Sequence, residues 1–219
     1  MKQHIRQFFQ FLEKKEGREI PLAVKLVNPK DFKITPKDLN VKGDLKLEYT
    51  SVTYLPDNLT VRGELALSDT PIKSLPNNLK VKEMLWLNGT KIESLPDTLK
   101  VEGGIYLSGT PIKYLPDTLI LRRGLYLQRT RNLTSLPNTL KVGGGLWLDG
   151  SSVTSLPNNL EVGEDLKLTD TSIESLPDNL RVEGAVLLRD TPLADKYTEE
   201  QIRSMIEERG GYVKKFIYL

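Results

Sequence analysis

The sequence predicts a solenoid in which short parallel strands form a β-sheet along one side of the molecule. Two observations carry this prediction: a unit of about twenty residues repeats eight times, and each unit alternates apolar and polar residues over one short stretch. The repeat prolines are Pro36, Pro56, Pro76, Pro96, Pro116, Pro137, Pro157 and Pro177, so every unit has twenty residues except one of twenty-one. A short fixed period indicates a solenoid, because each unit buries its apolar residues against its neighbours.

The units align as L-P-x-x-L-x-V-x-G-x-L-x-L-x-x-T-x-I-x-x, with position one at the first leucine. The L-x-L step has the alternation of a strand with one buried face. It recurs at Leu45/Leu47, Leu65/Leu67, Leu85/Leu87, Ile105/Leu107, Leu125/Leu127, Leu146/Leu148, Leu166/Leu168 and Val186/Leu188. Proline cannot donate to a central ladder, so the Leu-Pro segment is expected on the returning side. Twenty residues leave no room for a full helix there, and we expect extended chain or one 3₁₀ turn.

Two further positions of the unit bear on the turns between strands. Position sixteen carries a hydroxyl in every unit, and we expect these side chains to form a buried ladder of hydrogen bonds to the backbone rather than a catalytic row. They are Thr50, Thr70, Thr90, Thr110, Thr130, Ser151, Thr171 and Thr191. Position nine is glycine in only some units, so the backbone there does not require a positive φ.

The pattern L-x-L-x-x-T-x-I-x-x-L-P resembles the leucine-rich repeat family, specifically the short LPX-type repeats of bacterial effectors and of bacterial and tailed-phage proteins. The resemblance covers about Ile34 to Asp195 and implies a leucine-rich-repeat solenoid. Threonine stands at position sixteen, where the family commonly has asparagine. In effectors such repeats often precede a cysteine-dependent ubiquitin ligase domain. That activity does not carry over, because this chain has no cysteine.

Residues 1–33 are predicted to form an N-terminal cap of one helix and one strand. Four apolar residues follow helical spacing and make one stripe: Ile5, Phe8, Phe9 and Leu12. Phe11 lies off this stripe. Val24 and Leu26 stand twenty-one residues before Leu45 and Leu47, which predicts a degenerate first strand. The eight repeats then occupy residues 34–195.

Residues 196–219 are predicted to form a C-terminal cap, with a helix followed by a final strand. Thr198 and Gln201 make a capping box at the start of this helix, and Gly210-Gly211 ends it. The segment from Val213 to Leu219 returns to the V-x-G-x-L-x-L register. With both end strands, the sheet is expected to have about ten strands and a length of about 45 Å.

Composition excludes several classes of function. The chain has 219 residues, a net charge of +2, no cysteine and one histidine, His4. A cysteine nucleophile is therefore excluded, and a Ser-His-Asp triad and a histidine metal site are excluded because the one histidine lies in the predicted N-terminal helix. No segment has the apolar length of a signal peptide or a membrane span. We expect a non-enzymatic protein without cofactor, metal or membrane contact, located in the cytoplasm, or in the host cytoplasm if a phage encodes it.

Position twelve lies between the two buried leucines and faces outward. Including both end strands, its residues are Lys25, Lys46, Ala66, Trp86, Tyr106, Tyr126, Trp147, Lys167, Leu187 and Tyr218. The four consecutive aromatic residues, Trp86, Tyr106, Tyr126 and Trp147, are called the aromatic strip below. Position ten is glycine in three of these four units, which is expected to leave the ring faces clear. The strip is either a self-supporting stack or a binding platform, and four rings in consecutive units favour the platform.

Four arginines concentrate in the unit that has the extra residue: Arg122, Arg123, Arg129 and Arg131. The extra residue is expected to bulge the loop after the strand. Arginine beside tyrosine and tryptophan is typical of hot spots in protein interfaces. The same combination also suits phosphate recognition with base stacking.

The sequence therefore predicts a binding module that engages a protein partner through the strand face of repeats three to six. The predicted contact residues are Trp86, Tyr106, Tyr126, Trp147, Arg122, Arg129 and Arg131. One alternative is a binder that sequesters a nucleotide or nucleic acid, such as a phage protein acting on a host factor. A third is a scaffold that associates with itself through the strip, so the oligomeric state stays open.

Overall fold

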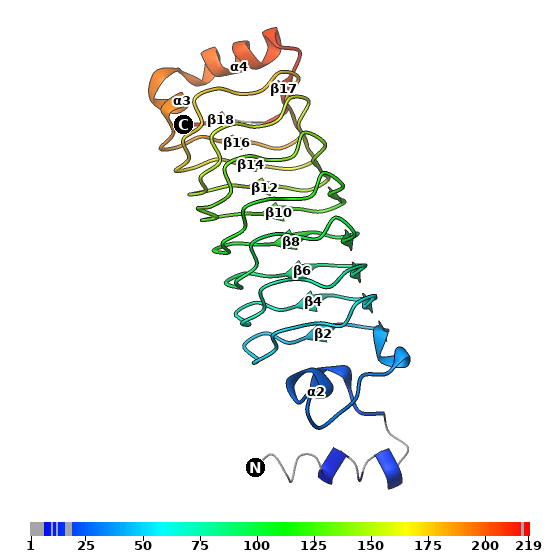
Figure 1. Ribbon diagram of the computed structural model, residues 1–219. Coiled ribbons are helices and arrows are strands. Elements are labelled where there is room, and N and C mark those ends of the chain that lie inside the picture. The colour runs from blue at the N-terminus through cyan, green and yellow to red at the C-terminus, as the bar shows by residue number, and fades with distance from the viewer. Residues whose placement is uncertain (1–6, 10, 12, 16–18, 216) are drawn as a thin grey trace.

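The protein is a repeat solenoid of stacked coils of parallel strands with a spacing of about twenty residues (Figure 1). The computed structural model describes residues 7–9, 11, 13–15, 19–215 and 217–219. Its main sheet has nine parallel strands that follow one another in chain order. They are β2 (Leu45–Lys46), β4 (Leu65–Ala66), β6 (Leu85–Trp86), β8 (Ile105–Tyr106), β10 (Leu125–Tyr126), β12 (Leu146–Trp147), β14 (Leu166–Lys167), β16 (Val186–Leu187) and β18 (Ile217–Tyr218). The sequence predicts about ten strands, and the missing one is the predicted first strand.

The returning side contains a second series of short parallel strands, which the repeat pattern alone does not predict. In the eight repeats each begins at position six, and the residue at position seven is buried except for Val41, which is half-buried. One sheet holds β1 (Asn40–Val41), β3 (Thr60–Val61), β5 (Lys80–Val81) and β7 (Lys100–Val101). The other holds β9 (Ile120–Leu121), β11 (Lys141–Val142), β13 (Glu161–Val162), β15 (Arg181–Val182) and β17 (Tyr212–Val213). The ladder breaks between β7 and β9, where the Arg122 amide donates to the Glu102 carbonyl oxygen.

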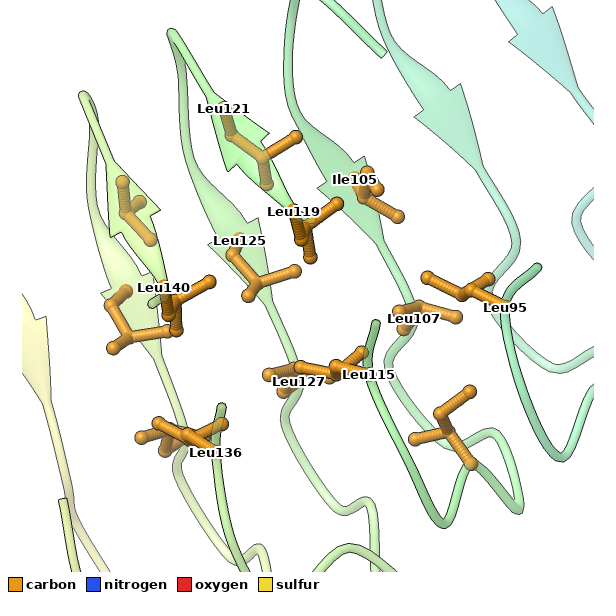
Figure 2. Close-up of a cluster of buried hydrophobic side chains, with 14 of the residues drawn as sticks. Leu95, Ile105, Leu107, Leu115, Leu119, Leu121, Leu125, Leu127, Leu136 and Leu140 are labelled. Carbon is orange, nitrogen blue, oxygen red and sulfur yellow. The ribbon is translucent and has the colours of Figure 1, made fainter. Parts of the chain in front are cut away.

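The core lies between the strands and the Leu-Pro segments of each coil. Equivalent side chains from neighbouring coils lie in rows, such as Leu95, Leu115 and Leu136 (Figure 2). Leu125 and Leu127 of one coil are fully buried, and so are their counterparts in the adjacent coils. Because every coil packs only on its neighbours, the apolar rows hold the outward residues in register along the sheet.

The predicted hydroxyl ladder at position sixteen is confirmed. Each threonine hydroxyl donates to the carbonyl oxygen three residues earlier, at 2.6–2.7 Å. These residues are Thr50, Thr70, Thr90, Thr110, Thr130, Thr171 and Thr191. Ser151 is the exception, because its Oγ is buried and has no hydrogen-bond partner. The ladder therefore closes every tight turn of the repeats except the one in the unit that follows the twenty-one-residue unit.

The predicted strand around Val24 and Leu26 is wrong, because Leu22–Val27 form a helix, α2. Pro21 precedes the helix, and Leu22 and Leu26 lie one turn apart on its buried side. Lys25, predicted to face outward, is buried and pairs with Asp38 at 2.8 Å. Asp38 belongs to a 3₁₀ helix, η1 (Pro36–Leu39), as expected for part of the returning side.

Of the predicted N-terminal stripe, Ile5 and Leu12 lie outside the described residues. Phe9 contacts the ring of Phe32 edge to face, with ring centroids 6.3 Å apart. Phe8 and Phe11 are exposed. Among the described aromatic side chains of this stretch, Phe9 thus provides the contact with the rest of the fold.

The C-terminal helix and strand lie where the sequence predicts them. A short helix, α3 (Pro192–Lys196), precedes α4 (Glu199–Glu208), whose first turn has the Thr198–Gln201 capping box. Strands β17 and β18 then extend the ladders of β15 and β16. Arg203 of α4 donates to the carbonyl oxygens of Val213 and Lys215 at the end of the stack. Helix α4 therefore lies against the last coil.

Candidate binding surface

The structure brings the four residues of the aromatic strip into one continuous row. They end strands β6, β8, β10 and β12, and each is the register partner of the next. The twenty-one-residue unit does not disturb this register, since Tyr126 still pairs with Trp147. The extra residue is instead taken up in a turn at 131–132, where the Leu133 amide donates to the Thr130 carbonyl oxygen at 3.4 Å. This is the predicted bulge.

Three rings of the strip are stacked face to face. The centroid of Trp86 lies 3.8 Å from that of Tyr106 at an interplanar angle of 7°. Tyr106 and Tyr126 are 4.1 Å apart at 3°. Both faces of the Tyr106 ring are therefore covered by its neighbours, and all four side chains of the strip are half-buried.

The fourth ring is oriented differently. Trp147 meets Tyr126 edge to face, with centroids 4.9 Å apart and an interplanar angle of 79°. The ammonium group of Lys167 lies 3.6 Å from the centroid of the Trp147 ring, which is close enough for a cation–π interaction. Lys167 is a contact that is absent from the predicted set, although its place in the next unit at position twelve signals it.

Two of the three glycines at position ten, Gly124 and Gly145, do not leave the ring face clear, so the prediction is wrong for them. A Cβ built on Gly124 would lie 2.7 Å from the hydroxyl oxygen of Tyr126. A Cβ on Gly145 would lie 2.9 Å from Nε1 of Trp147. The rings of Tyr126 and Trp147 thus fold back over the glycine two residues earlier in the chain, and these two glycines let the rings lie down on the sheet. Because both faces of the Tyr106 ring are covered, its exposed part is the ring edge.

Polar atoms of Trp86, Tyr106 and Tyr126 have partners within the strip or the adjacent coil. Nε1 of Trp86 donates to Oε2 of Glu64 at 3.3 Å. Burial raises the pKa of Tyr106 to about 12, together with hydrogen bonding to Tyr126 and the nearby charge of Glu64. Tyr106 is therefore a neutral hydroxyl at physiological pH.

The predicted arginine cluster is divided into two pairs. Arg122 and Arg123 precede β10, whereas Arg129 and Arg131 follow it. Arg123 forms an exposed ion pair with Glu83 across two coils, with Nη2 and Oε2 3.8 Å apart. Strand β10 thus separates the two arginine pairs, although they are close in sequence. Only Arg129 and Arg131 follow the end of β10, the strand that carries Tyr126.

Arg129 and Arg131 line a groove of about 490 Å³. Its other lining residues are Ser108, Gln128, Asp149, Gly150, Thr169 and Asp170. Ser108 Oγ donates to Oε1 of Gln128 at 2.6 Å, which orders one wall. Arg129 itself has a positive φ of 59°, at a position where the other units have glycine or aspartate, except for Tyr49 in the first unit. The groove therefore offers both signs of charge. Three of its lining residues, Ser108, Gln128 and Asp149, each follow a residue of the aromatic strip by two positions.

Neither a metal cluster nor a membrane span is found in the part of the chain that the structure describes. No group of three or more histidine, cysteine, aspartate or glutamate side chains there could hold a metal ion. No helix there is long and apolar enough to cross a bilayer.

Comparison with known proteins adds no relative. No protein-family model matches the sequence, and no curated protein matches it. The fold and the surface therefore define a repeat solenoid with an ordered aromatic row on its main sheet.

Proposed function

We propose that the chain is a non-enzymatic binding module of the leucine-rich-repeat type that holds a protein partner on its nine-stranded sheet. The observation that carries the proposal is the ordered aromatic strip beside the arginine-lined groove. Tyrosine, tryptophan and arginine are the residues most enriched among interface hot spots. The leucine-rich-repeat assignment is supported by the motif L-x-L-x-x-T-x-I-x-x-L-P and by the parallel coils.

The order of the strip favours tight binding. Ordering a side chain at an interface costs about 0.5–1.5 kcal/mol, and rings already held by stacking avoid most of this cost. Stacking of Trp86, Tyr106 and Tyr126 at about 4 Å fixes their rotamers before any partner arrives. The exposed edges, with the Tyr106 and Tyr126 hydroxyls, then form a flat and partly polar contact area.

The arginines have separate roles in this proposal. Arg129 and Arg131 form the rim of the contact, where the groove also carries Asp149 and Asp170. A partner with acidic and basic groups side by side suits this rim, and such charges set orientation and association rate more than affinity. Arg122 stands on the opposite side of the strand and is not part of this rim.

The nucleotide alternative is less well supported. Base stacking requires an open ring face, whereas both faces of Tyr106 and one face of Trp86 are already stacked. The ammonium group of Lys167 lies over the Trp147 ring. Except at the second face of Trp86, a base would have to displace a ring or a lysine, so the strip is better suited to a protein surface. Self-association through the strip predicts light scattering that rises to a dimer mass with concentration.

The test begins with a pull-down in which the wild-type protein captures its partner. The partner is then identified and its binding is titrated by calorimetry. Tyr126→Ala/Trp147→Ala should weaken binding by about 2 kcal/mol or more, roughly thirtyfold, because anchor residues lose this much on truncation. Tyr114→Ala is the matched control, since Tyr114 is an exposed tyrosine outside the strip. Circular dichroism would verify that all variants fold. Equal binding by the wild type and the double variant would overturn the proposal.

A further inference from the structure

The outer face of the second strand series carries a linear set of basic residues, which we call the basic ridge. Positions six and eight flank the buried residue of each of these strands, so they face outward together. In repeats one to six they hold Lys42, Arg62, Lys80, Lys82, Lys100, Arg122 and Lys141, all of them exposed. Glu102 is the only acidic residue at these positions in the same repeats. The ridge is far more basic than the whole chain, whose net charge is +2.

The basic ridge is not neutralised within the described part of the protein. None of its seven cations forms an ion pair there, and Arg62 makes only a side-chain hydrogen bond to the Asn40 amide oxygen at 3.3 Å. The two later repeats differ, because their positions six and eight hold two acidic residues and one basic residue, Glu161, Glu183 and Arg181. There Lys214 pairs with Glu183 at 2.8 Å. The strand series therefore has a compensated end and an uncompensated basic end.

Two lysines of the ridge oppose each other directly. Lys80 and Lys100 are register partners on β5 and β7, about 4.8 Å apart along the stack. Like charges at opposed positions of a sheet destabilise the pairing. A bound anion would relieve this repulsion, so the arrangement is better adapted to a bound state than to the free one.

The shape of the ridge restricts the class of anion. Repeats one to six extend over about 24 Å along the stack, in two parallel rows with one charge or more per coil. The backbone amides of Lys80, Lys82 and Lys100 are already bonded to the preceding coil, so a peptide strand cannot be added between these coils. Ile120 is the only exposed apolar side chain at these positions, which leaves little to insert into a membrane. A linear polyanion with evenly spaced charges fits this surface.

We propose that the basic ridge binds the phosphate backbone of a nucleic acid without regard to sequence. Lysines contact phosphates as point charges, and such contacts release condensed counterions. This surface lies on the second strand series and uses none of the four rings of the strip, so it stands or fails independently of the proposed protein partner. It assigns Arg122 to nucleic-acid contact instead of the strand face.

Fluorescence anisotropy with labelled single-stranded and duplex oligonucleotides of about 20 nucleotides tests the proposal. The logarithm of the binding constant should fall linearly with the logarithm of the NaCl concentration between about 50 and 200 mM, with a slope of about −4 to −6 for six or seven phosphate contacts. Lys80→Glu/Lys100→Glu should weaken binding at least tenfold and reduce the slope by about 1.5 to 2. Lys80→Gln/Lys100→Gln should also weaken oligonucleotide binding, but by a smaller factor.

The control variant is Lys73→Glu/Lys91→Glu, which makes the same change in net charge at exposed positions outside the ridge. It should bind nearly as the wild type does, and so should Tyr126→Ala/Trp147→Ala. Equal weakening by both charge-reversal variants would overturn the proposal, since the attraction would then be a property of net charge alone. Absence of oligonucleotide binding at low salt would also overturn it. Binding to phosphatidylserine vesicles through Lys80 and Lys100, with no oligonucleotide binding, would assign the ridge to a membrane surface instead.

Discussion

Replacement of Gly124 by alanine should remove Tyr126 from the aromatic stack without changing any aromatic residue. The new Cβ would lie 2.7 Å from the hydroxyl oxygen of Tyr126 and 2.8 Å from two atoms of its ring, so the ring must leave its place over the strand. Tyr126 then loses its stacked contact with Tyr106 at 4.1 Å and its edge contact with Trp147 at 4.9 Å. Each aromatic pair contributes about 0.5–1.5 kcal/mol, so the free energy of unfolding should fall by about 1–3 kcal/mol.

Gly43→Ala is the matched control, because a Cβ built on Gly43 meets no atom within 4 Å. That substitution should be neutral or stabilising by up to about 1 kcal/mol, since alanine restricts the unfolded chain. The assay is urea denaturation, combined with near-ultraviolet circular dichroism to report the order of the rings. Gly124→Ala should lose near-ultraviolet signal and stability, whereas Gly43→Ala should keep both. Unchanged signal and stability in Gly124→Ala would refute the role of the position-ten glycines in seating the rings.

Two further substitutions test the packing of the turns and the N-terminal end. Ser151→Thr should raise the free energy of unfolding by about 1 kcal/mol in thermal denaturation, because threonine at this position donates to a carbonyl oxygen in seven other units while Ser151 Oγ is unpartnered. No gain would mean that Ser151 has a partner in solution, such as water. Burial opposes ionisation of Asp38, yet hydrogen bonds from Lys25 and Thr35 outweigh it, so the pKa of Asp38 is lowered. A lowered pKa stabilises the fold above the unfolded-state value of about 4, and this contribution is lost as pH falls through the folded-state pKa. Asp38→Asn should therefore flatten the stability profile between about pH 5 and 2, the range around and below the unfolded-state pKa, and an unchanged profile would contradict the assigned pair.

The sequence predicts the parts of the fold that depend on the repeat itself. A fixed period assigns every residue to a position, and alternation at positions ten to thirteen separates buried Leu125 and Leu127 from outward Tyr126. The threonine ladder follows for the same reason, since a short polar side chain in a tight turn bonds to the nearest backbone carbonyl. These features are local to one unit, and eight units repeat them.

Other features depend on competing patterns. The segment Leu22–Val27 shows strand alternation at Val24 and Leu26 and helical spacing at Leu22 and Leu26, and the helix prevails. The second strand series is hard to predict because little in the repeat distinguishes it from extended chain. Its signal in the sequence is a buried valine between two polar residues.

The site could be predicted only in part. The register predicts that four aromatic residues form a row, but the direction of each ring is set by side-chain packing over Gly124 and Gly145, which no periodicity specifies. Closeness in sequence also suggests one arginine cluster, whereas the intervening strand separates Arg122 from Arg129. The rows along the second strand series become visible only when residues twenty apart, such as Lys80 and Lys100, are paired.

The central claim is that the aromatic strip is a surface for a protein partner. The most direct measurement is the affinity of the identified partner for the wild type, for Tyr126→Ala/Trp147→Ala and for Tyr114→Ala. If the strip anchors the partner, the affinity of the double variant should fall about thirtyfold or more, and that of Tyr114→Ala should not change. If the double variant loses stability and binds the partner as tightly as the wild type, the strip serves only to hold the sheet together.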